Sequence, residues 1–408
     1  MCNYSTLLTI DNYPMTTLNF DNTENAFAYK PNYELIRDYQ IFRLINQGWL
    51  VKFGTRAASK MMDAGFKIPV AIGMRPTIYA VFCGGDSLQL ATKKINQLYD
   101  YKVQSILDYG VEGKENEEDF TRTANAIKEA ILFAKDNDAV DIVCSKFTGL
   151  IPFSILEKLH AKETLTDKEN EIFKASKERI YSISKLAFEN NVSLFVDAEE
   201  SWIQQPLDDL TFELMKEFNK EKPIIYNTVQ LYRKDRLQFF KDTVEKAKHT
   251  GFIYAAKLVR GAYMEKEELR AKQLAYENPI QTSKENTDKD YNDALRFAIN
   301  NIEQVAVCVA THNEESTLLA TQLMQQKKLP NNHPHVHFSQ LLGMSDHISF
   351  NIAKENYNSS KYMPYGPVKD VIPYLIRRAQ ENTSVAGQMG RELKLLKDEV
   401  RRRKLFVW

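Results

Sequence analysis

The chain has 408 residues, of which 43% are apolar, and its 54 basic and 54 acidic residues give a formal net charge of zero. Its length suits two or three small domains or one α/β barrel with additions. The balanced charge argues against a nucleic-acid-binding protein, which normally carries a basic excess or stripe. No apolar run approaches the roughly twenty residues that a membrane span requires. The N-terminus resembles neither a secretory signal nor a transit peptide.

Four cysteines are present, at positions 2, 83, 144 and 308, and none forms a CxxC pair. Three of them, Cys83, Cys144 and Cys308, lie inside predicted strands, where a cysteine usually fills space as a small apolar residue. This usage predicts a reducing, cytoplasmic setting without structural disulfides.

The first third of the chain is predicted to be mostly helical. Residues 1–32 are polar and aperiodic and are expected to form a flexible arm. Apolar residues then recur at helical spacing in three stretches, 33–65, 88–109 and 120–135. We expect these helices to form an N-terminal layer over residues 33–138, which also contains the first strand of a sheet.

Short continuous apolar runs, each followed by a helical segment, recur through the chain. These runs are 77–83, 139–147, 192–198, 223–231, 252–263, 304–311, 335–342 and 359–363. Strands that are apolar on both faces and alternate with helices predict a parallel sheet, and eight of them predict a closed (β/α)8 barrel. The barrel would continue over residues 139–385, followed by a C-terminal helix at 386–408. A doubly wound sheet is disfavoured because the sequence contains no GxGxxG turn.

Polar residues stand at the ends of the predicted strands or, for Lys257 and Arg260, within the fifth of them, where packing alone would favour Val, Ile or Leu. They are Lys146, Asp197, Gln230, Lys257, Arg260, Thr311, His312, Gln340 and Tyr362. The carboxyl ends of the strands form the active site in α/β barrels. Burial of so many polar groups is costly unless a ligand or mutual pairing satisfies them. The pattern therefore favours a functional site, although Lys146 taken alone could extend from a strand end to solvent.

A metal site is not expected. His333, His335 and His337 share one face of a predicted strand, because alternate residues of a strand point the same way. However, no carboxylate or cysteine nearby completes a convincing set of ligands.

The stretch 362–381, YMPYGPVKDVIPYLIRRAQE, ends in a predicted helix that begins near Ile372. Its spacings of three, four and seven place Tyr374, Arg377, Arg378 and Glu381 on roughly one face. An arginine pair is often a solvated basic patch. Here Glu381 can brace one of the guanidinium groups, and a braced pair is a good receptor for a small carboxylate.

This helix resembles the YxxRRxxE signature of proline dehydrogenase. The motifs SKFTG, DAEES, KLVRGAY, THN, QLLGM, YMPYGPV and YLIRRAQEN follow in the family order, and the resemblance extends over residues 77–381. It implies a distorted (β/α)8 barrel that binds FAD without a nucleotide-binding sandwich and oxidises L-proline. It also implies a membrane quinone as electron acceptor and peripheral contact with a membrane.

The resemblance assigns roles residue by residue. The residues expected to bind the substrate are Lys146, Tyr362, Tyr374, Arg377, Arg378 and Glu381. Those expected to bind FAD are Ala198, Gln230, Lys257, Arg260, Gly261, Ala262, Thr311, His312 and Gln340. Asp197 matches an aspartate treated as catalytic. Lys257 takes a place near flavin N5 where bacterial relatives often carry an arginine, and it is also expected to act in catalysis.

The expected reaction is a hydride transfer from C5 of proline to flavin N5, which yields Δ1-pyrroline-5-carboxylate. Two other enzymatic readings remain: hydroxyproline as substrate, or another flavin barrel that uses a pyridine nucleotide. A non-enzymatic binding scaffold would leave the polar strand ends unexplained. The C-terminal run RELKLLKDEVRRRKLFVW predicts a basic amphipathic helix, which suits an anionic surface, a partner helix or packing on the barrel.

Overall fold

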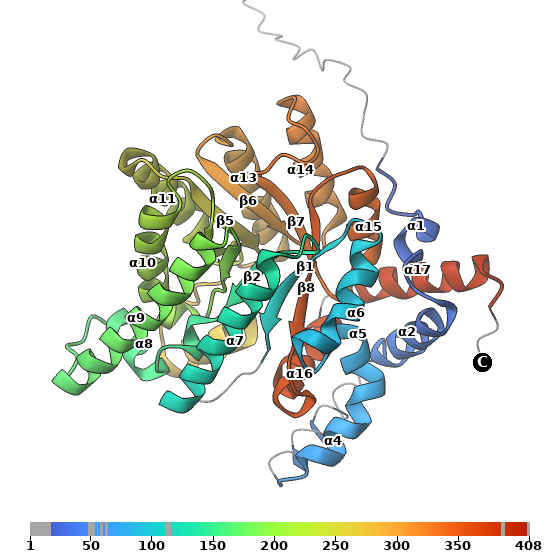
Figure 1. Ribbon diagram of the computed structural model, residues 1–408, viewed down its shortest axis with the longest axis horizontal. Helices are drawn as coiled ribbons and strands as arrows, with labels where there is room; N and C mark the ends of the chain where they lie inside the picture. The colour runs from blue at the N-terminus through green and yellow to red at the C-terminus, as the bar shows by residue number, and fades with distance from the viewer. Residues whose placement is uncertain are drawn as a thin grey trace, which may run out of the picture.

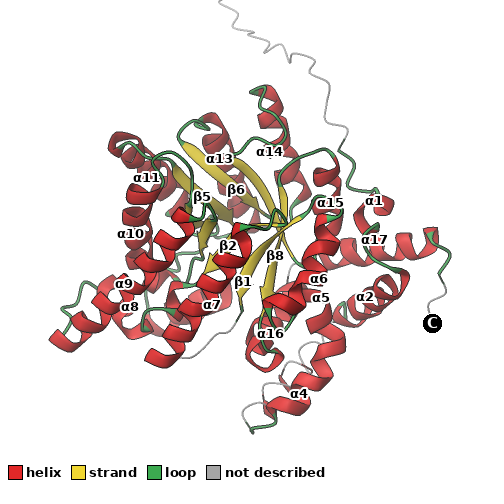
Figure 2. Cartoon of the chain, in the orientation of Figure 1, coloured by secondary structure: helices red, strands yellow, loops and turns green. Residues whose placement is uncertain are grey.

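A computed structural model describes residues 18–47, 54, 56–57, 60–61, 64–110, 116–384 and 388–405. Within these ranges, the side chains of residues 67–68, 377–384 and 388–389 are not described. The strands form a closed parallel barrel in which each strand pairs with the next and β8 pairs with β1. Helices surround the strands (Figure 2). The predicted (β/α)8 barrel is confirmed.

The strands follow one another around the barrel in chain order. They are β1 (Gln104–Tyr109), β2 (Val140–Ser145), β3 (Ser193–Val196), β4 (Ile225–Gln230), β5 (Tyr254–Val259), β6 (Val305–Ala310), β7 (Val336–Leu341) and β8 (Ser359–Tyr365). Their apolar composition fits strands that are covered on both faces, since one face packs inside the barrel and the other packs against helices.

The helices before the barrel are α1 (Thr23–Phe27), α2 (Asn32–Ile45), α4 (Lys67–Met74), α5 (Ala80–Phe82) and α6 (Leu88–Tyr99), with a π-helical turn at Arg75–Tyr79. The later helices are α7 (Glu117–Lys135), α8 (Phe153–His160), α9 (Asp167–Glu189), α10 (Ser201–Phe218), α11 (Arg236–Thr250), α12 (Met264–Leu274), α13 (Lys284–Asn300), α14 (Glu314–Gln326), α15 (Asp346–Lys354), α16 (Val368–Ser384) and α17 (Gln388–Arg402).

Side-chain alternation along the strands separates two apolar layers. Ile106, Cys144, Phe195, Ala255 and Tyr362 belong to a cluster that fills the inside of the barrel. The residues between them face outward and join the large core between sheet and helices. Because the period of a strand is two, polar residues two positions after these inner residues also point into the barrel.

A second apolar cluster joins the two ends of the described chain. In Figure 1, α1, α2 and α17 lie together on one side of the barrel. Leu395, Leu396 and Val400 of α17 are buried in this cluster with residues of α1 and α2. The C-terminal helix therefore uses its apolar face for packing within the chain. None of the helices in the described part of the chain has the length and apolar content that a bilayer crossing requires.

The predicted strand at 77–83 is wrong, because this segment continues a helix. Tyr79 ends the π-helical turn, and Val81 and Phe82 lie in α5. Their side chains are buried in the second apolar cluster. A short apolar run fits a buried helix as well as a buried strand, so its composition alone does not separate the two.

The first strand lies instead within the predicted helix at 88–109. The helix α6 ends at Tyr99, and a turn containing Lys102, with φ of 62°, leads into β1. The apolar residues of the strand continued the helical spacing of α6 closely enough to hide this turn. The other seven predicted strands and the helix expected at 120–135 are present. The helical stretch expected over 33–65 is present as α2 up to Ile45, and residues 48–53, 55, 58–59 and 62–63 of it lie outside the described residues.

The flexible arm expected over 1–32 is wrong for its second part, because Phe20, Ala26, Phe27 and Tyr29 are buried. Residues 1–17 of the expected arm lie outside the described residues. Lys30 lies in a buried charge cluster with Asp38, Asp346 and Lys361, which we call the flank cluster. Lys30 Nζ lies 2.6 Å from Asp38 and 3.0 Å from Asp346, and Lys361 Nζ lies 2.8 Å from Asp346. Burial acts to raise the pKa of Asp346, but Lys30 and Lys361 outweigh it and hold this pKa well below its usual range.

Replacing Lys30 with Met should destabilise the fold, because it removes the buried cation that Asp38 and Asp346 share and leaves Asp38 with Arg37 and Asp346 with Lys361. We expect the free energy of unfolding to fall by about 3–5 kcal/mol, measured by urea denaturation. Lys168→Met, at an exposed position of α9, is the control and should change it by less than about 0.5 kcal/mol. Equal effects of the two substitutions would contradict a stabilising role of the flank cluster.

Candidate active site

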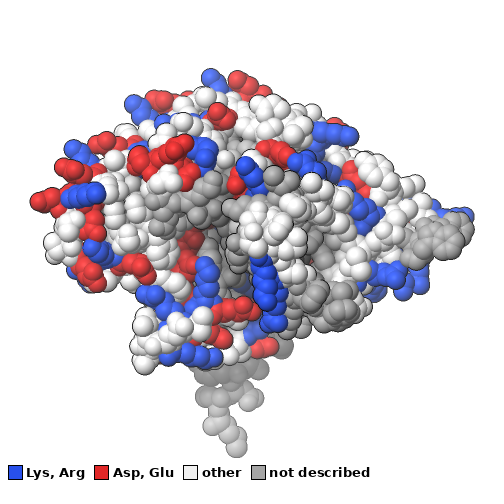
Figure 3. All heavy atoms as spheres, turned by 90° about the horizontal axis from the view of Figure 1, so that it is seen from below, with Lys and Arg blue, Asp and Glu red and all other residues white. Residues whose placement is uncertain are grey.

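The carboxyl ends of the strands gather five polar side chains inside the barrel, from β1, the ends of β2 and β3, β5 and β8. We call Asp108, Lys146, Asp197, Lys257 and Tyr362 the mouth cluster. Asp108, Lys146, Asp197 and Lys257 each lie two positions after an inner residue, and Tyr362 is itself an inner residue, so the alternation of the strands points all five inward. Seen from this end, the surface shows a hollow near its middle, with charged side chains of both signs around it (Figure 3).

The ammonium group of Lys146 lies between two carboxylates. Its Nζ lies 3.0 and 2.9 Å from the two oxygens of Asp108 and 3.2 Å from Asp197 Oδ2. The hydroxyl of Tyr362 lies 3.1 Å from the same nitrogen. The four side chains therefore form one connected polar group at the barrel mouth.

Asp197 connects the two lysines. Its Oδ1 accepts a hydrogen bond from Lys257, and its Oδ2 accepts one from the Tyr362 hydroxyl at 2.8 Å. The Lys257 ammonium also lies 5.5 Å from the centre of the Tyr362 ring, within the range of a cation–π contact. The aromatic ring is thus held between the lysines and the two aspartates.

Burial and pairing act in opposite directions on the two aspartates. Burial acts to raise the pKa of Asp197, but Lys257 and Lys146 outweigh it and hold this pKa well below its usual range. Burial raises the pKa of Asp108 above its ordinary value, although Lys146 opposes the shift. Burial acts to lower the pKa of Lys257, but Asp197 outweighs it and keeps the ammonium charged.

A second chain of polar contacts crosses the ends of β5, β6 and β7. Arg260 donates to Asp288 at 2.7 Å and to the hydroxyl of Thr311 at 2.7 Å. Gln340 donates to the carbonyl oxygen of Thr311 at 3.0 Å and accepts from Ser349 at 2.7 Å. Three residues expected at a cofactor site, Arg260, Thr311 and Gln340, are therefore in direct contact.

The other residues expected near the cofactor lie at the strand ends between these two groups. Gln230 is buried and donates to the carbonyl oxygen of Glu199 at 2.8 Å, and Ala198 is almost fully buried. Ala262 is exposed beyond β5. Gly261 has φ of 146°, and a Cβ there would lie 2.3 Å from the Tyr232 ring, so close packing requires the glycine.

The helix α16 holds the arginine pair of the YxxRRxxE motif. The backbone at Arg377, Arg378 and Glu381 is helical, as predicted, but the side chains of these three residues lie outside the described part of the structure. Tyr374 is buried in the second apolar cluster.

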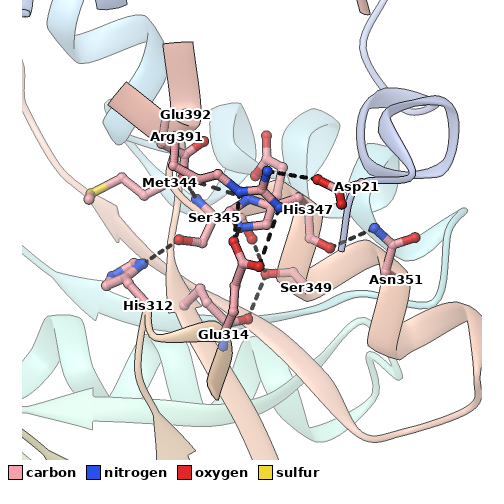
Figure 4. A network of polar contacts seen from close by, with 12 residues as sticks. Asp21, His312, Glu314, Met344, Ser345, His347, Ser349, Asn351, Arg391 and Glu392 are labelled. Carbon is pink, nitrogen blue, oxygen red and sulfur yellow. Dashed lines mark hydrogen bonds and ion pairs between the residues drawn. The ribbon is translucent and has the colours of Figure 1, made fainter. Parts of the chain in front are cut away.

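His312 is linked through Ser345 to the C-terminal helix (Figure 4). The Ser345 hydroxyl lies 2.9 Å from His312 Nδ1, and the Ser345 backbone N–H donates to Glu392 of α17. Ser345 itself adopts a left-handed backbone conformation with φ of 51°. Beside this link, Glu314 lies 3.0 Å from His347 Nε2 and 2.8 Å from Arg391 Nε, so Glu314 of α14 contacts both α15 and α17.

The two carboxylates of the mouth cluster and the neighbouring thiol of Cys144 are of the types that bind metals. Ligand atoms of Asp108, Cys144 and Asp197 lie within 4.8 Å of one another. Lys146 and Lys257 already neutralise the carboxylates, and burial raises the pKa of Cys144 well above its usual value. A cation at this position would have to displace two ammonium groups, so we assign no metal to it.

The histidines considered as metal ligands make other contacts. His335 Nδ1 lies 2.8 Å from the carbonyl oxygen of Ile302, and His337 Nε2 lies 2.5 Å from the Ser360 hydroxyl.

Two acidic residues near the site escaped the sequence analysis as functional candidates. Asp108 belongs to the strand that was predicted as helix, and the one signal for it is a lone aspartate after SIL. Glu199 accepts hydrogen bonds from Thr148 at 2.7 Å and Tyr263 at 2.6 Å. Burial raises the pKa of Glu199 to about 7, although these two hydrogen bonds oppose the shift.

Comparison with known proteins adds independent observations. The family model described as proline dehydrogenase matches residues 91–391. Proline dehydrogenase 1, mitochondrial, of Dictyostelium discoideum is 31% identical over 429 residues, which cover 94% of this chain and 74% of that protein. Hydroxyproline dehydrogenase of Xenopus laevis is 30% identical over 413 residues, covering 93% of this chain and 89% of that protein. The mitochondrial names of several relatives leave the expected cytoplasmic setting without support.

Among solved structures, proline utilization A from Bdellovibrio bacteriovorus, inactivated by N-propargylglycine, superposes with a TM-score of 0.70 at 22% identity. The match covers 93% of this chain and 41% of that one. At this identity the likeness supports the barrel fold.

Glu314 should make stability depend on pH in the acid range. Hydrogen bonds from His347 and Arg391 lower its pKa to about 2, although burial acts to raise it. The carboxylate of the folded state therefore binds its proton at a lower pH than that of the unfolded chain. Its stabilising contribution is complete above the unfolded pKa of about 4.5 and disappears as the pH falls toward 2. The difference in unfolding free energy between the parent and Glu314→Gln should therefore shrink from about pH 6 to about pH 3.

The matched control is Glu315→Gln, which alters the exposed neighbouring carboxylate. The same pH dependence in both variants would show that the contacts of Glu314 are not its source.

Proposed function

Since this chain belongs to the proline dehydrogenase family of oxidoreductases, we propose that it uses FAD to oxidise L-proline to Δ1-pyrroline-5-carboxylate and passes the electrons to a membrane quinone. The observation that carries the proposal is the mouth cluster. It places two lysines and a tyrosine at the carboxyl end of the barrel, within the residues that the family model matches. This is the arrangement expected for a site that holds a small carboxylate substrate beside a cofactor.

The residues around the barrel mouth are of the types that FAD requires. Arg260 is a partly exposed cation at the end of β5, which suits the diphosphate of a dinucleotide. Lys257, further inside the same strand, suits the electron-rich part of a reduced flavin. Gln230, Gln340, Thr311 and His312 add hydrogen-bonding groups between these cations, and Ala198, Gly261 and Ala262 leave the strand ends without bulky side chains. When bound, FAD would supply the hydride acceptor.

The chain's own residues would position the substrate. Lys146 would bind the carboxylate together with Arg377 and Arg378, and Glu381 would brace the two guanidinium groups. Tyr362 would pack against the pyrrolidine ring, and Tyr374, which is buried in the second apolar cluster, would hold the helix that carries the arginine pair. Positioning of this kind lowers the barrier because the reacting carbon is held close to its acceptor.

Asp197 would act through the groups that it holds. It accepts hydrogen bonds from Lys257 and Tyr362, and its low pKa keeps it ionised at neutral pH. Its charge offsets part of the two ammonium charges, and its two oxygens fix the relative placement of the lysine and the tyrosine. The ring nitrogen of proline would react as the neutral amine.

Contact with a membrane surface would bring the protein to its quinone. The apolar face of α17 is packed on α1 and α2, and its outer face carries the exposed residues Lys394, Lys397, Arg401 and Arg402. A basic face of this kind is attracted to anionic lipid headgroups, with about 1 kcal/mol for each basic residue near the surface. We therefore propose peripheral contact through charge.

An absorbance spectrum tests the proposal directly. We expect the purified protein to be yellow, and we expect L-proline, added without oxygen, to bleach the flavin. A quinone should then restore the colour, and it should do so faster when it is carried in anionic vesicles than in neutral ones.

Trans-4-hydroxy-L-proline must be tested beside proline, because a hydroxyproline dehydrogenase is among the similar proteins. Faster bleaching by hydroxyproline would reverse the substrate assignment. Bleaching by NAD(P)H but not by either imino acid would indicate another flavin barrel, and a colourless protein would indicate a scaffold.

Arg378→Met tests the carboxylate receptor. We expect the KM for L-proline to rise by about two orders of magnitude or more, because a charge-assisted pair to the carboxylate is lost, while the flavin stays bound. Arg296→Met, at an exposed position of α13, is the matched control and should leave KM unchanged. Loss of flavin with an unchanged KM would contradict the role given to Arg378.

A further inference from the structure

The mouth cluster contains one carboxylate that the family motifs do not account for, that of Asp108 at the end of β1. Both of its oxygens contact Lys146 Nζ, at 3.0 and 2.9 Å, and its side chain is only 2% exposed. Asp197 contacts the same nitrogen from the other side at 3.2 Å. Lys146 is thus held by two carboxylates before any substrate carboxylate approaches it.

The charges of the cluster balance. Two ammonium groups, of Lys146 and Lys257, face two carboxylates, of Asp108 and Asp197, so these four described side chains carry no net charge. Lys146 is the most exposed of the four, at 19%, and is therefore the group that a ligand in the barrel mouth reaches first. An anionic ligand must then compete with Asp108 for the same ammonium group.

We infer that Asp108 is a positioning residue that fixes the Lys146 ammonium group at the barrel mouth and weakens its attraction for the carboxylate of the substrate and product. The inference rests on the proposed function, in which Lys146 binds that carboxylate. Substrate and product carry the same carboxylate, so a weaker attraction for it speeds release of the product. Asp108 thereby lowers the affinity for substrate and product and raises the turnover rate.

The surroundings of Asp108 support this role. It faces Lys146 and Cys144 of the β2 segment, Asp197 after β3 and Tyr362 of β8. Burial and the nearby charge of Asp197 both raise the pKa of Asp108, so its ionised form depends on Lys146. A buried carboxylate of this kind destabilises the fold unless a cation such as Lys146 is paired with it.

Asp108→Asn removes the charge and keeps the size of the side chain. We expect tetrahydrofuran-2-carboxylate, a ring carboxylate without an amine, to bind this variant on the order of tenfold more tightly by calorimetry, because one competing negative charge is gone. Turnover should fall by a similar factor. Asp108→Glu keeps the charge and should show no tighter binding. Asp141→Asn, at the opposite end of β2 beside His337, is the matched control and should behave like the parent.

A double variant shows whether Asp108 acts through Lys146. In a Lys146→Met background, Asp108→Asn should no longer tighten binding of the ring carboxylate, because the two residues are coupled. Unchanged or weaker binding in the single variant, or the same tightening in both backgrounds, would overturn the inference.

The same experiment separates this inference from the proposed function. A parent that binds the ring carboxylate but is not bleached by L-proline would refute the proposed reaction and leave the role of Asp108 to be decided by the binding data. A parent that does not bind the ring carboxylate would overturn both. Flavin content and urea denaturation of each variant report whether it is folded.

Discussion

The balance of buried charge at the carboxyl end of the barrel is the constraint on which both the fold and the site depend. Each ion of the mouth cluster is tolerated there because the others are present, since a buried charge without a partner costs several kcal/mol. The ions come from the ends of β1, β2, β3 and β5, so they meet only if the barrel closes in the correct register. The pairing of Ile106 with Tyr362 across β1 and β8 completes this closure and brings the tyrosine hydroxyl into the cluster.

The alternation of β8 connects the mouth cluster to the flank cluster. Tyr362 points into the barrel, where it contacts Lys146 and Asp197. The preceding residue, Lys361, points outward and pairs with Asp346, which is also bound by Lys30 of the N-terminal segment. A shift of β8 by one residue would exchange the two side chains and break both clusters. Docking of the chain ends on the barrel therefore also holds the strand that carries the active-site tyrosine.

Sequence reasoning found the site where polar residues interrupt a recognisable apolar strand. Lys146 and Asp197 stand near the ends of such runs and Lys257 lies within one, and the rule that barrel sites form at the carboxyl ends of strands was enough to group them. Asp108 was missed because its strand continues the helical spacing of α6, and only the turn at Lys102 separates the two elements. The run at 77–83 was wrongly predicted as a strand for a different reason: a helix that is buried on all sides is as apolar as a buried strand.

The pairing of distant segments was also beyond local pattern. Lys30 looked like part of a polar arm, and its burial depends on pairing with Asp346, more than 300 residues away in the sequence. Likewise, the apolar face of α17 suited a membrane, a partner or the barrel equally well, and what decides it is the set of apolar residues that α1 and α2 present to α17.

The two charge clusters have the same composition, two lysines and two aspartates, but their exposure differs in a way that separates structure from function. In the flank cluster, the side chains of Lys30, Lys361 and Asp346 are 4%, 0% and 3% exposed, so no ligand can compete for them without local unfolding. In the mouth cluster, Lys146 and Asp197 are 19% and 14% exposed. An ion pair that is partly open to solvent can exchange one partner for an incoming carboxylate at low cost, because the lysine stays paired throughout. The same chemistry therefore stabilises the fold where it is closed and provides a binding site where it is open.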